Sequence, residues 1–231
     1  MTIKSSKTLG GIGAILLFIG GLAPILLFAS VSAFVAVPFL ALLGLVGLIL
    51  VLVALHDLAN NYKEGGIFNN ALYSFITGIV GIVATGITFV YLFFYTTILT
   101  DFLRAIFPGW NGDWSTLAGL TPDTSNITTS NSAPLIEAFF LALAVLWIFS
   151  IIAAFFARRS LKVLSAKASV GLFSTGALLL LIGGFLVIVG IGFILMLIAL
   201  LLIAIAFFQI KPQPEQPVAT ATPSPSMPTP V

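Results

Sequence analysis

The sequence contains no cysteine in its 231 residues. This absence excludes disulfides, thiolate catalysis and metal sites with cysteine ligands. Charged residues are scarce as well, at 7% of the chain, whereas a soluble domain carries about 25%. So few charged side chains cannot cover a surface that faces water. The chain also has a single histidine and lacks an HExxH pair, a GxSxG elbow and a phosphate loop. We therefore expect no enzymatic activity and no cofactor.

Hydrophobic residues make up 60% of the chain and form long runs without charge. Residues 8–56 and residues 168–210 contain no Asp, Glu, Lys or Arg. As single straight helices they would be roughly 70 and 65 Å long, about twice a hydrocarbon core of ~30 Å. Each run must therefore fold back on itself. The expected turn markers are Pro24, Ser30, Ser32 and Pro38 in the first run, and Gly190 and Gly192 in the second.

The predicted fold is all-α, a polytopic transmembrane helical bundle of about six spans. The transmembrane domain covers residues 1–210, and residues 211–231 form a Pro/Ser/Thr-rich tail that we expect to be disordered. Residues 100–133 form an external loop. The expected spans are 9–29, 34–56, 69–99, 134–158, 169–188 and 191–210.

The basic residues predict the orientation of this bundle. Eight of the nine fall where six spans place cytoplasmic segments, so we expect a multi-pass protein of the cell membrane with both termini in the cytoplasm. These eight are Lys4, Lys7, Lys63, Arg158, Arg159, Lys162, Lys167 and Lys211. Asn126 begins an N-glycosylation triplet in the external loop, which agrees with this orientation. The net charge of +2 is too small to suggest binding to nucleic acid.

An internal repeat links the two ends of the chain. Residues 13–21 read GAILLFIGG, and residues 176–184 read GALLLLIGG. Each copy opens a predicted hairpin on the same side of the membrane, so the pairs 9–56 and 169–210 are interpreted as related hairpins inserted in the same sense. Val31-Ser32-Ala33 resembles a signal-cleavage site, but the second apolar stretch follows at once, and we expect the segment to be retained.

Two sets of residues are candidates for contacts within or beside the membrane. Ser74, Thr77, Gly81 and Thr85 share one side of the third span, and they serve either close helix packing or a polar pore wall. Arg158, Arg159, Lys162 and Lys167 form the densest basic cluster. That cluster either sets the topology or binds anionic lipid headgroups.

The remaining polar positions have structural explanations beside functional alternatives. The alternatives are a proton relay or metal site at His56-Asp57, a cavity-facing Glu137 and a ligand or partner site at residues 60–70. An enzyme would need His56 and Glu137 to converge on one cavity. His56-Asp57 is expected to close the second helix, and Glu137 to lie in the first turn of the fourth. Gly65 and Gly66 are expected to form the turn before the third helix, with Asn69 or Asn70 capping that helix.

Three segments of the chain resemble a known family. They read SSKTLGGIGAILLFIGG at the start, NNYKEGGIFNNALYSFITGIVG in the middle and RRSLKVLSAKASVGLFSTGALLLLIGG near the end. They are similar to the archaeal membrane family called domain of unknown function 996. This resemblance implies a helical multi-span fold in an archaeal membrane, and no activity or functional residue transfers with it.

The expected role is that of an accessory, scaffold or regulatory component of the membrane. Its expected partners are membrane lipids, other membrane proteins or a second copy of the chain, and not nucleic acid. The alternative is a transporter or channel for a small neutral or lipophilic solute. A water-filled cavity lined by Ser74, Thr77 and Thr85 would favour transport, whereas a dry bundle would contradict it.

Overall fold

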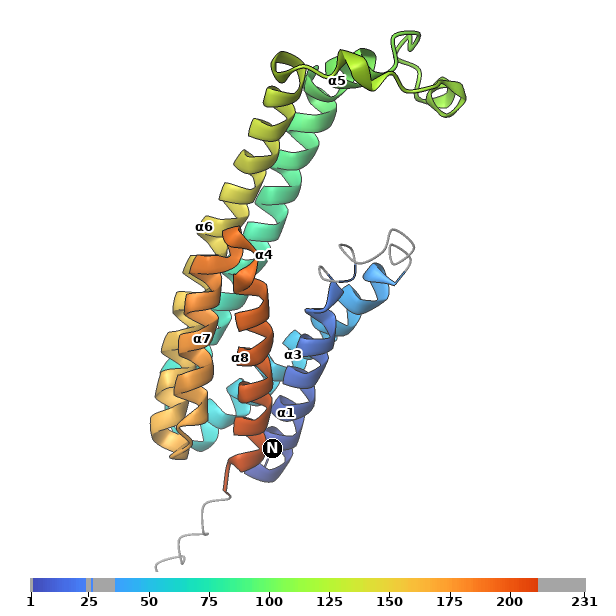
Figure 1. The fold of residues 1–231 in the computed structure, drawn as a ribbon. Coiled ribbons are helices and arrows are strands. Elements are labelled where there is room, and N and C mark those ends of the chain that lie inside the picture. Colours follow the sequence, from blue (N-terminus) through green and yellow to red (C-terminus); the bar gives the residue numbers. More distant parts are fainter. Residues whose placement is uncertain (1, 24–25, 27–35, 212–231) are drawn as a thin grey trace, which may run out of the picture.

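The computed structural model describes residues 2–23, 26 and 36–211. In this part of the chain all regular structure is helical, and six helices are long and apolar enough to cross a membrane (Figure 1). The all-α multi-span prediction is therefore confirmed. The predicted first turn around Pro24, Ser30 and Ser32, the cleavage-like triplet at 31–33 and the tail at 212–231 lie outside the described residues.

The six long helices pair as three antiparallel hairpins. The first contains α1 (Ile3–Gly20) and α3 (Val37–Asn61). The second contains α4 (Gly65–Val90), which continues as a short π-helix, η2 (Tyr91–Tyr95), and α6 (Thr129–Ala168). The third contains α7 (Leu172–Leu186), the 3-10 turn η5 (Val187–Val189) and α8 (Ile191–Gln209). The predicted repeat hairpins thus correspond to α1–α3 and α7–α8, and both start at the same end of the bundle.

Glycine lets the helices of the two outer hairpins approach closely. A Cβ added at Gly47 on α3 would lie 2.5 Å from the carbonyl oxygen of Gly13 on α1, and one added at Gly20 would lie 2.5 Å from Gly44 Cα. In the third hairpin, a Cβ at Gly192 would lie 2.2 Å from the carbonyl oxygen of Gly183. Close backbone contact of this kind is what packs helices in lipid, where burying apolar surface gives no advantage.

The three hairpins join through α1 with α8, α3 with α4, and α6 with α7. Their shared core contains the fully buried side chains Phe173, Phe207, Leu58, Ile67 and Leu164. The rings of Phe173 and Phe207 meet edge to face with centroids 5.0 Å apart. These residues come from five different helices, α3, α4, α6, α7 and α8, and all lie near the helix ends that meet where the N-terminus and the end of α8 lie (Figure 1).

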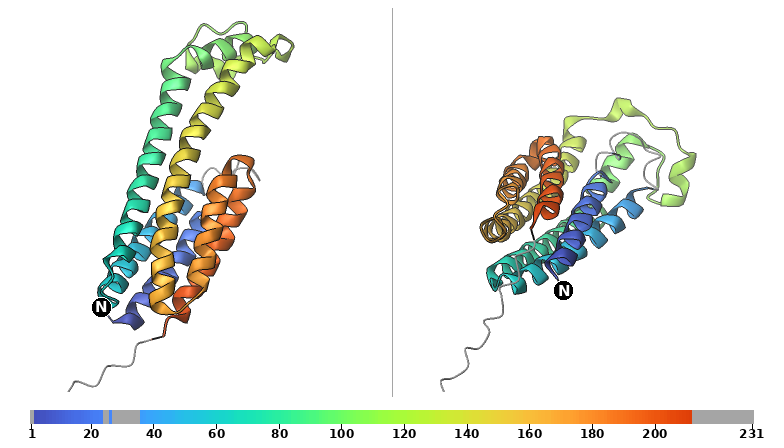
Figure 2. Two further views of the ribbon diagram at one scale, coloured as in Figure 1. Left: turned by 90° about the vertical axis from the view of Figure 1, so that its left-hand side faces the viewer. Right: turned by 90° about the horizontal axis from the view of Figure 1, so that it is seen from below.

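The middle hairpin is much longer than the other two. At about 1.5 Å per residue, the 40 residues of α6 span ~60 Å, whereas the 19 residues of α8 span ~28 Å. Trp147 on α6 donates a hydrogen bond from Nε1 to the carbonyl oxygen of Phe185, close to the turn between α7 and α8. Beyond that level, α4 and α6 are the long helices that continue in the described part of the chain, as Figures 1 and 2 show.

We call this extension the outer rod and define it as residues 82–95 and 129–146. Large apolar side chains cover it, and Ile82 and Ile87 on α4 are 67% and 66% exposed. At its far end lie α5 (Ile98–Ile106) and the 3-10 turns η3 (Trp114–Gly119) and η4 (Thr124–Asn126). An exposed apolar surface of this extent fits a lipid or protein environment and not water.

Two predicted connections are much shorter than expected. The fourth span was predicted to end at residue 158 and the fifth to begin at 169, but α6 continues to Ala168. The reason is packing, because Leu161 and Leu164 are buried and Ser160 donates a 2.6 Å hydrogen bond to the carbonyl oxygen of Ile67. Basic residues are good helix formers, so their charge does not end a helix.

The turn between α3 and α4 also differs from its prediction. It contains only Tyr62, Lys63 and Glu64, and Lys63 adopts the left-handed conformation with φ 52°. Gly65 and Gly66 already belong to α4. Asn70 donates to the carbonyl oxygen of Gly66 within the helix, so the capping role predicted for Asn69 or Asn70 is wrong.

Candidate functional site

Basic side chains gather at one end of the bundle, which we call the basic end. It is formed by the start of α1, the α3–α4 turn, the end of α6 with the α6–α7 turn, and the end of α8 (Figure 1). These segments carry Lys4, Lys7, Lys63, Lys162, Lys167 and Lys211. Arg104 lies at the opposite end on α5, where its guanidinium is 3.6 Å from the Asp101 carboxylate. The basic residues are therefore distributed unequally, as predicted. Most lie at the basic end, whereas Arg104 lies at the opposite end beside a carboxylate.

The cluster predicted to bind lipid, Arg158, Arg159, Lys162 and Lys167, lies on the last turns of α6 at this end. Lys167 pairs with Glu64 at 3.2 Å, which ties α6 to the α3–α4 turn. Arg159 places its guanidinium 5.1 Å from the centroid of the Phe155 ring, a cation–π contact. Arg158 is half-buried, whereas Lys162 is exposed. The four residues therefore extend along three turns of helix and do not form a compact site, and their role in lipid binding stays a prediction.

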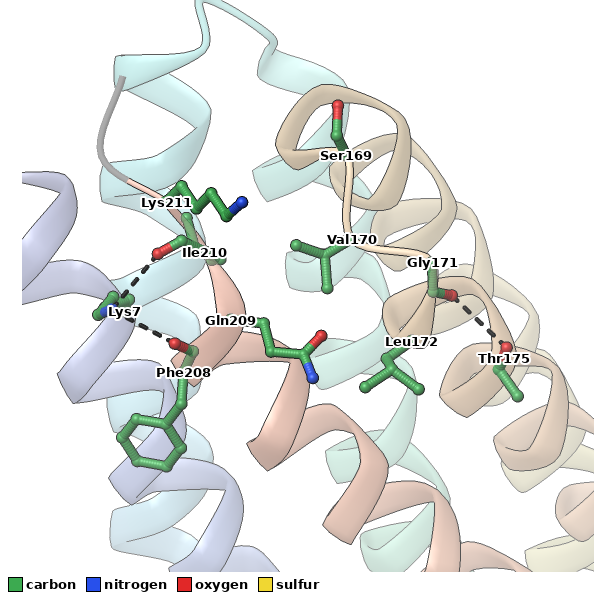
Figure 3. A pocket seen from close by; sticks show the side chains of 10 residues that line it. All are labelled: Lys7, Ser169, Val170, Gly171, Leu172, Thr175, Phe208, Gln209, Ile210 and Lys211. Atoms are coloured by element: carbon green, nitrogen blue, oxygen red, sulfur yellow. Dashed lines mark hydrogen bonds between the residues drawn. The ribbon is translucent and has the colours of Figure 1, made fainter. Parts of the chain in front are cut away.

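A pocket of about 830 Å³ opens at the basic end between the end of α8 and the α6–α7 turn (Figure 3). Its wall on the α8 side carries Lys7, Gln209 and Lys211, and its opposite wall carries Ser169 and Thr175. Lys7 donates from Nζ to the carbonyl oxygens of Phe208 at 3.3 Å and Ile210 at 3.4 Å. No Asp or Glu lines this pocket in the part of the chain that the structure describes.

This pocket was not predicted from the sequence. Lys7 and Lys211 are far apart in the chain, and each was explained by its flanking position alone. The one sequence feature that pointed to the pocket was that Lys7 and Lys211 both lie beside the predicted cytoplasmic ends of spans. The pairing of α1 with α8, which brings them to one pocket, has no counterpart in hydrophobic periodicity.

The polar residues of α4 serve hydrogen bonds within the bundle. Ser74 donates to the carbonyl oxygen of Ala153 on α6 at 2.8 Å, and Thr85 donates to the carbonyl oxygen of Gly81 on its own helix at 2.8 Å. A Cβ at Gly81 would lie 2.5 Å from Phe149 Cβ. Ser74 and Gly81 thus lie at the α4–α6 contact, and Thr77 is half-buried on the same helix.

The ionisable residues considered for chemistry lie far apart. His56 Nδ1 is 3.8 Å from Asp57 Oδ1, and the imidazole packs edge to face on Phe68 near the basic end. Glu137 is exposed on α6, within the outer rod. His56 and Glu137 therefore do not converge on one cavity. The predicted place of Glu137 in the first turn of its helix is wrong, because α6 already begins at Thr129. Among the residues that the structure describes, no group of three His, Cys, Asp or Glu side chains is placed to hold a metal ion.

Turns with aspartate at their first position shape the loop beyond the outer rod. Backbone and hydroxyl hydrogen bonds from Ser115 lower the pKa of Asp113, and hydrogen bonds from the Ser125 hydroxyl and amide lower the pKa of Asp123. The indole of Trp110 is buried against Trp114 and donates to the carbonyl oxygen of Asp113 at 2.7 Å. The exposed Asn126 donates its side-chain amide to Asp123 at 3.1 Å.

The sequence of the chain matches one known protein family over most of its length. Residues 43–201 match the family described as Protein of unknown function (DUF996). The chain belongs to this family. The DUF996 match includes two of the three segments that carry the resemblance, namely residues 60–81 and 158–184, and the first segment lies before it. No curated protein and no solved structure matches the chain. Within DUF996 the matched region spans α4 to α7 completely, so the long middle hairpin belongs to the family portion of the chain.

Proposed function

We propose that the protein is a non-enzymatic accessory, scaffold or regulatory component of an archaeal cell membrane, with both termini in the cytoplasm. The observation that carries the proposal is the contrast between its interior and its outer rod. The outer hairpins are closed by glycine contacts between backbones. The outer rod extends past the other two hairpins and presents large apolar side chains outward, as at Ile82, Ile87, Phe140 and Leu141. A surface of this kind is available for lateral contact with lipids or with other membrane helices.

The charges support the orientation and the absence of catalysis. The lysines gathered at the basic end fit the cytoplasmic side, where Lys and Arg accumulate in membrane proteins. The separation of His56 from Glu137 weighs against an acid–base pair built from these two residues.

Affinity purification from the native membrane in mild detergent tests the accessory role. We expect the tagged full chain to recover a constant set of membrane proteins, and the pair of substitutions Ile82→Ala and Ile87→Ala to reduce that recovery. Phe39→Ala with Leu42→Ala is the matched control, because these α3 side chains are 67% and 59% exposed but lie off the outer rod. Recovery of the chain alone, or equal loss in both pairs, would contradict the proposal.

A second candidate, transport of a small lipophilic solute, rests on one observation. A groove of about 660 Å³ lies on the outer rod and is lined by apolar groups and two tyrosines: Val83, Gly86, Ile87, Val90, Tyr91 and Tyr95. It suits a hydrocarbon chain better than water. The hydroxyls of Ser74 and Thr85 already donate to backbone carbonyls, which weighs against a polar path lined by them.

Filling the groove separates the two candidates. Gly86→Leu would occupy it, whereas Gly78→Leu is a control at another open position of α4, since a Cβ meets nothing within 4 Å at either glycine. Uptake of a lipophilic dye into proteoliposomes that falls only with Gly86→Leu would favour transport. Dye uptake equal to that of empty liposomes would exclude transport of that dye and leave the accessory role in place.

A further inference from the structure

The pocket at the basic end combines positive charge, hydrogen-bond donors and an apolar floor. Lys7 and Lys211 supply the charge, and neither has a carboxylate within ion-pair distance in the described part of the chain. Figure 3 shows the Lys211 ammonium and the Gln209 amide directed toward the α6–α7 turn across the pocket. Val170, Leu172 and Phe208 contribute apolar groups to the same lining.

Lys7 is positioned by the fold and not by an acidic partner. Two of its three ammonium protons are directed to the carbonyl oxygens of Phe208 and Ile210, which leaves one donor and the full charge available. The side chain is half-buried, so this charge is held in place and less screened by solvent than that of a free surface lysine. An anion in the pocket would therefore meet a fixed cation from α1 and a second cation from the end of α8.

The donors and apolar groups that line the pocket indicate which kind of anion it could bind. A phosphate ester needs several donors around its oxygens, and the two lysines, Gln209 and the Ser169 hydroxyl are donors of suitable type. The apolar part of the lining fits the carbon chain that follows such a phosphate. The pocket lies at the end of the charge-free helices α7 and α8, the depth at which lipid headgroups lie.

We propose that this pocket binds a phosphate ester, namely the headgroup phosphate of an anionic membrane lipid, between α1, α8 and the α6–α7 turn. The bound headgroup would join the first and third hairpins, whose direct contact is made by α1 and α8. This site is separate from the cluster Arg158, Arg159, Lys162 and Lys167, none of which lines the pocket.

Native mass spectrometry of the purified full chain in detergent tests the proposal. The probes are phosphatidylglycerol, phosphatidylcholine and, in a parallel thermal-unfolding assay, inorganic phosphate. We expect Lys7→Gln with Lys211→Gln to weaken phosphatidylglycerol binding by roughly tenfold or more, since each lysine near a membrane surface contributes a several-fold effect. The matched control is Lys4→Gln with Lys63→Gln, which removes the same charge from the same end but outside the pocket.

A second variant guards against loss of folding in the first. Gln209→Glu adds a negative charge to the pocket wall and keeps the carbonyl contacts of Lys7, and we expect it to weaken binding by a similar factor. Phosphatidylglycerol binding that is lost only in the pocket variants supports the lipid headgroup. If inorganic phosphate raises the unfolding temperature and phosphatidylglycerol binds no better than phosphatidylcholine, the ligand is a soluble phosphate ester and not a lipid headgroup. Equal loss in the control pair, or no effect of Gln209→Glu, would overturn the site.

Discussion

Hydroxyl side chains at the α4–α6 contact show how single residues tie long helices together. Ser160 is 1% exposed and donates to the carbonyl oxygen of Ile67, and Ser74 makes the equivalent bond to Ala153 seven residues further along α4. Both bonds join α4 to α6. Because such carbonyls already accept a bond within their own helix, the hydroxyl adds a second, inter-helical bond without leaving a group unsatisfied.

Removing the Ser160 hydroxyl should therefore cost about one hydrogen bond. We expect Ser160→Ala to lower the free energy of unfolding by about 1 kcal/mol, measured by reversible unfolding in mixed micelles. Ser174→Ala is the control, because this serine is exposed at the start of α7 and should change stability by less than ~0.5 kcal/mol. An equal effect of both substitutions would show that the inter-helical bond contributes nothing specific.

The two loop aspartates should respond differently to loss of their serine partners. For Asp123 the strongest cause of the lowered pKa is the Ser125 hydroxyl, whereas for Asp113 it is the Ser115 backbone amide. Ser125→Ala should therefore raise the pKa of Asp123 more than Ser115→Ala raises that of Asp113, as measured by carboxyl carbon chemical shifts during titration. A larger increase in the pKa of Asp113 than in that of Asp123 would contradict the view that the Ser125 hydroxyl is the stronger influence.

The sign of the associated pH dependence follows from the lowered values. A carboxyl group whose pKa is lower in the folded loop stabilises that loop above its unfolded pKa of about 3.8. The contribution is lost as the pH falls through the folded value. We expect amide exchange in residues 113–126 to accelerate below about pH 4, while exchange in the bundle core stays unchanged. A loop that keeps its protection in acid would show that these turns do not depend on ionised aspartate.

Among the helices, glycine decides which pairs come into backbone contact. Gly47 faces the carbonyl oxygen of Gly13, whereas Gly78 on α4 faces open space. The same substitution should therefore have opposite effects at the two positions. Alanine at Gly47 must push α1 and α3 apart, and alanine at Gly78 improves helix propensity without a clash.

We expect Gly47→Ala to lower the free energy of unfolding by about 1–3 kcal/mol, and Gly78→Ala to raise it by up to about 1 kcal/mol. Reversible unfolding in micelles of both variants and the parent chain is the measurement. Stabilisation by Gly47→Ala would contradict the close contact between α1 and α3.

The length of charge-free runs predicted the helices well, because a run twice the thickness of a membrane has to turn back. Their ends were harder to predict. Arg158 to Lys167 was read as a connection because it is charged, yet buried Leu161 and Leu164 keep it helical. The π-helix at Tyr91–Tyr95 gave no signal in composition. The pocket of Lys7 and Lys211 depended on which helix ends meet, and that information lies in tertiary packing alone.

For the molecule as a whole, the absence of cysteine allows a direct test of orientation. Lys63 and Thr121 are both exposed, at the basic end and in the far loop respectively. We expect Thr121→Cys to react with a membrane-impermeant maleimide in intact cells and Lys63→Cys to react only after permeabilisation, because basic segments stay in the cytoplasm. The opposite pattern would reverse the proposed orientation.

Because the hairpins differ in length, the cross-section of the molecule changes along its long axis. Near the basic end the six long helices lie together, and beyond the contact of Trp147 with Phe185 α4 and α6 are the long helices that continue in the described part of the chain (Figure 2). A hydrocarbon core of ~30 Å can surround the six-helix part, where α8 spans ~28 Å, but not the full ~60 Å of α6 as well. The apolar part of the middle hairpin that remains must tilt into the bilayer or be covered by another protein. The fold therefore builds in a hydrophobic mismatch, which makes the protein sensitive to the thickness of the membrane around it.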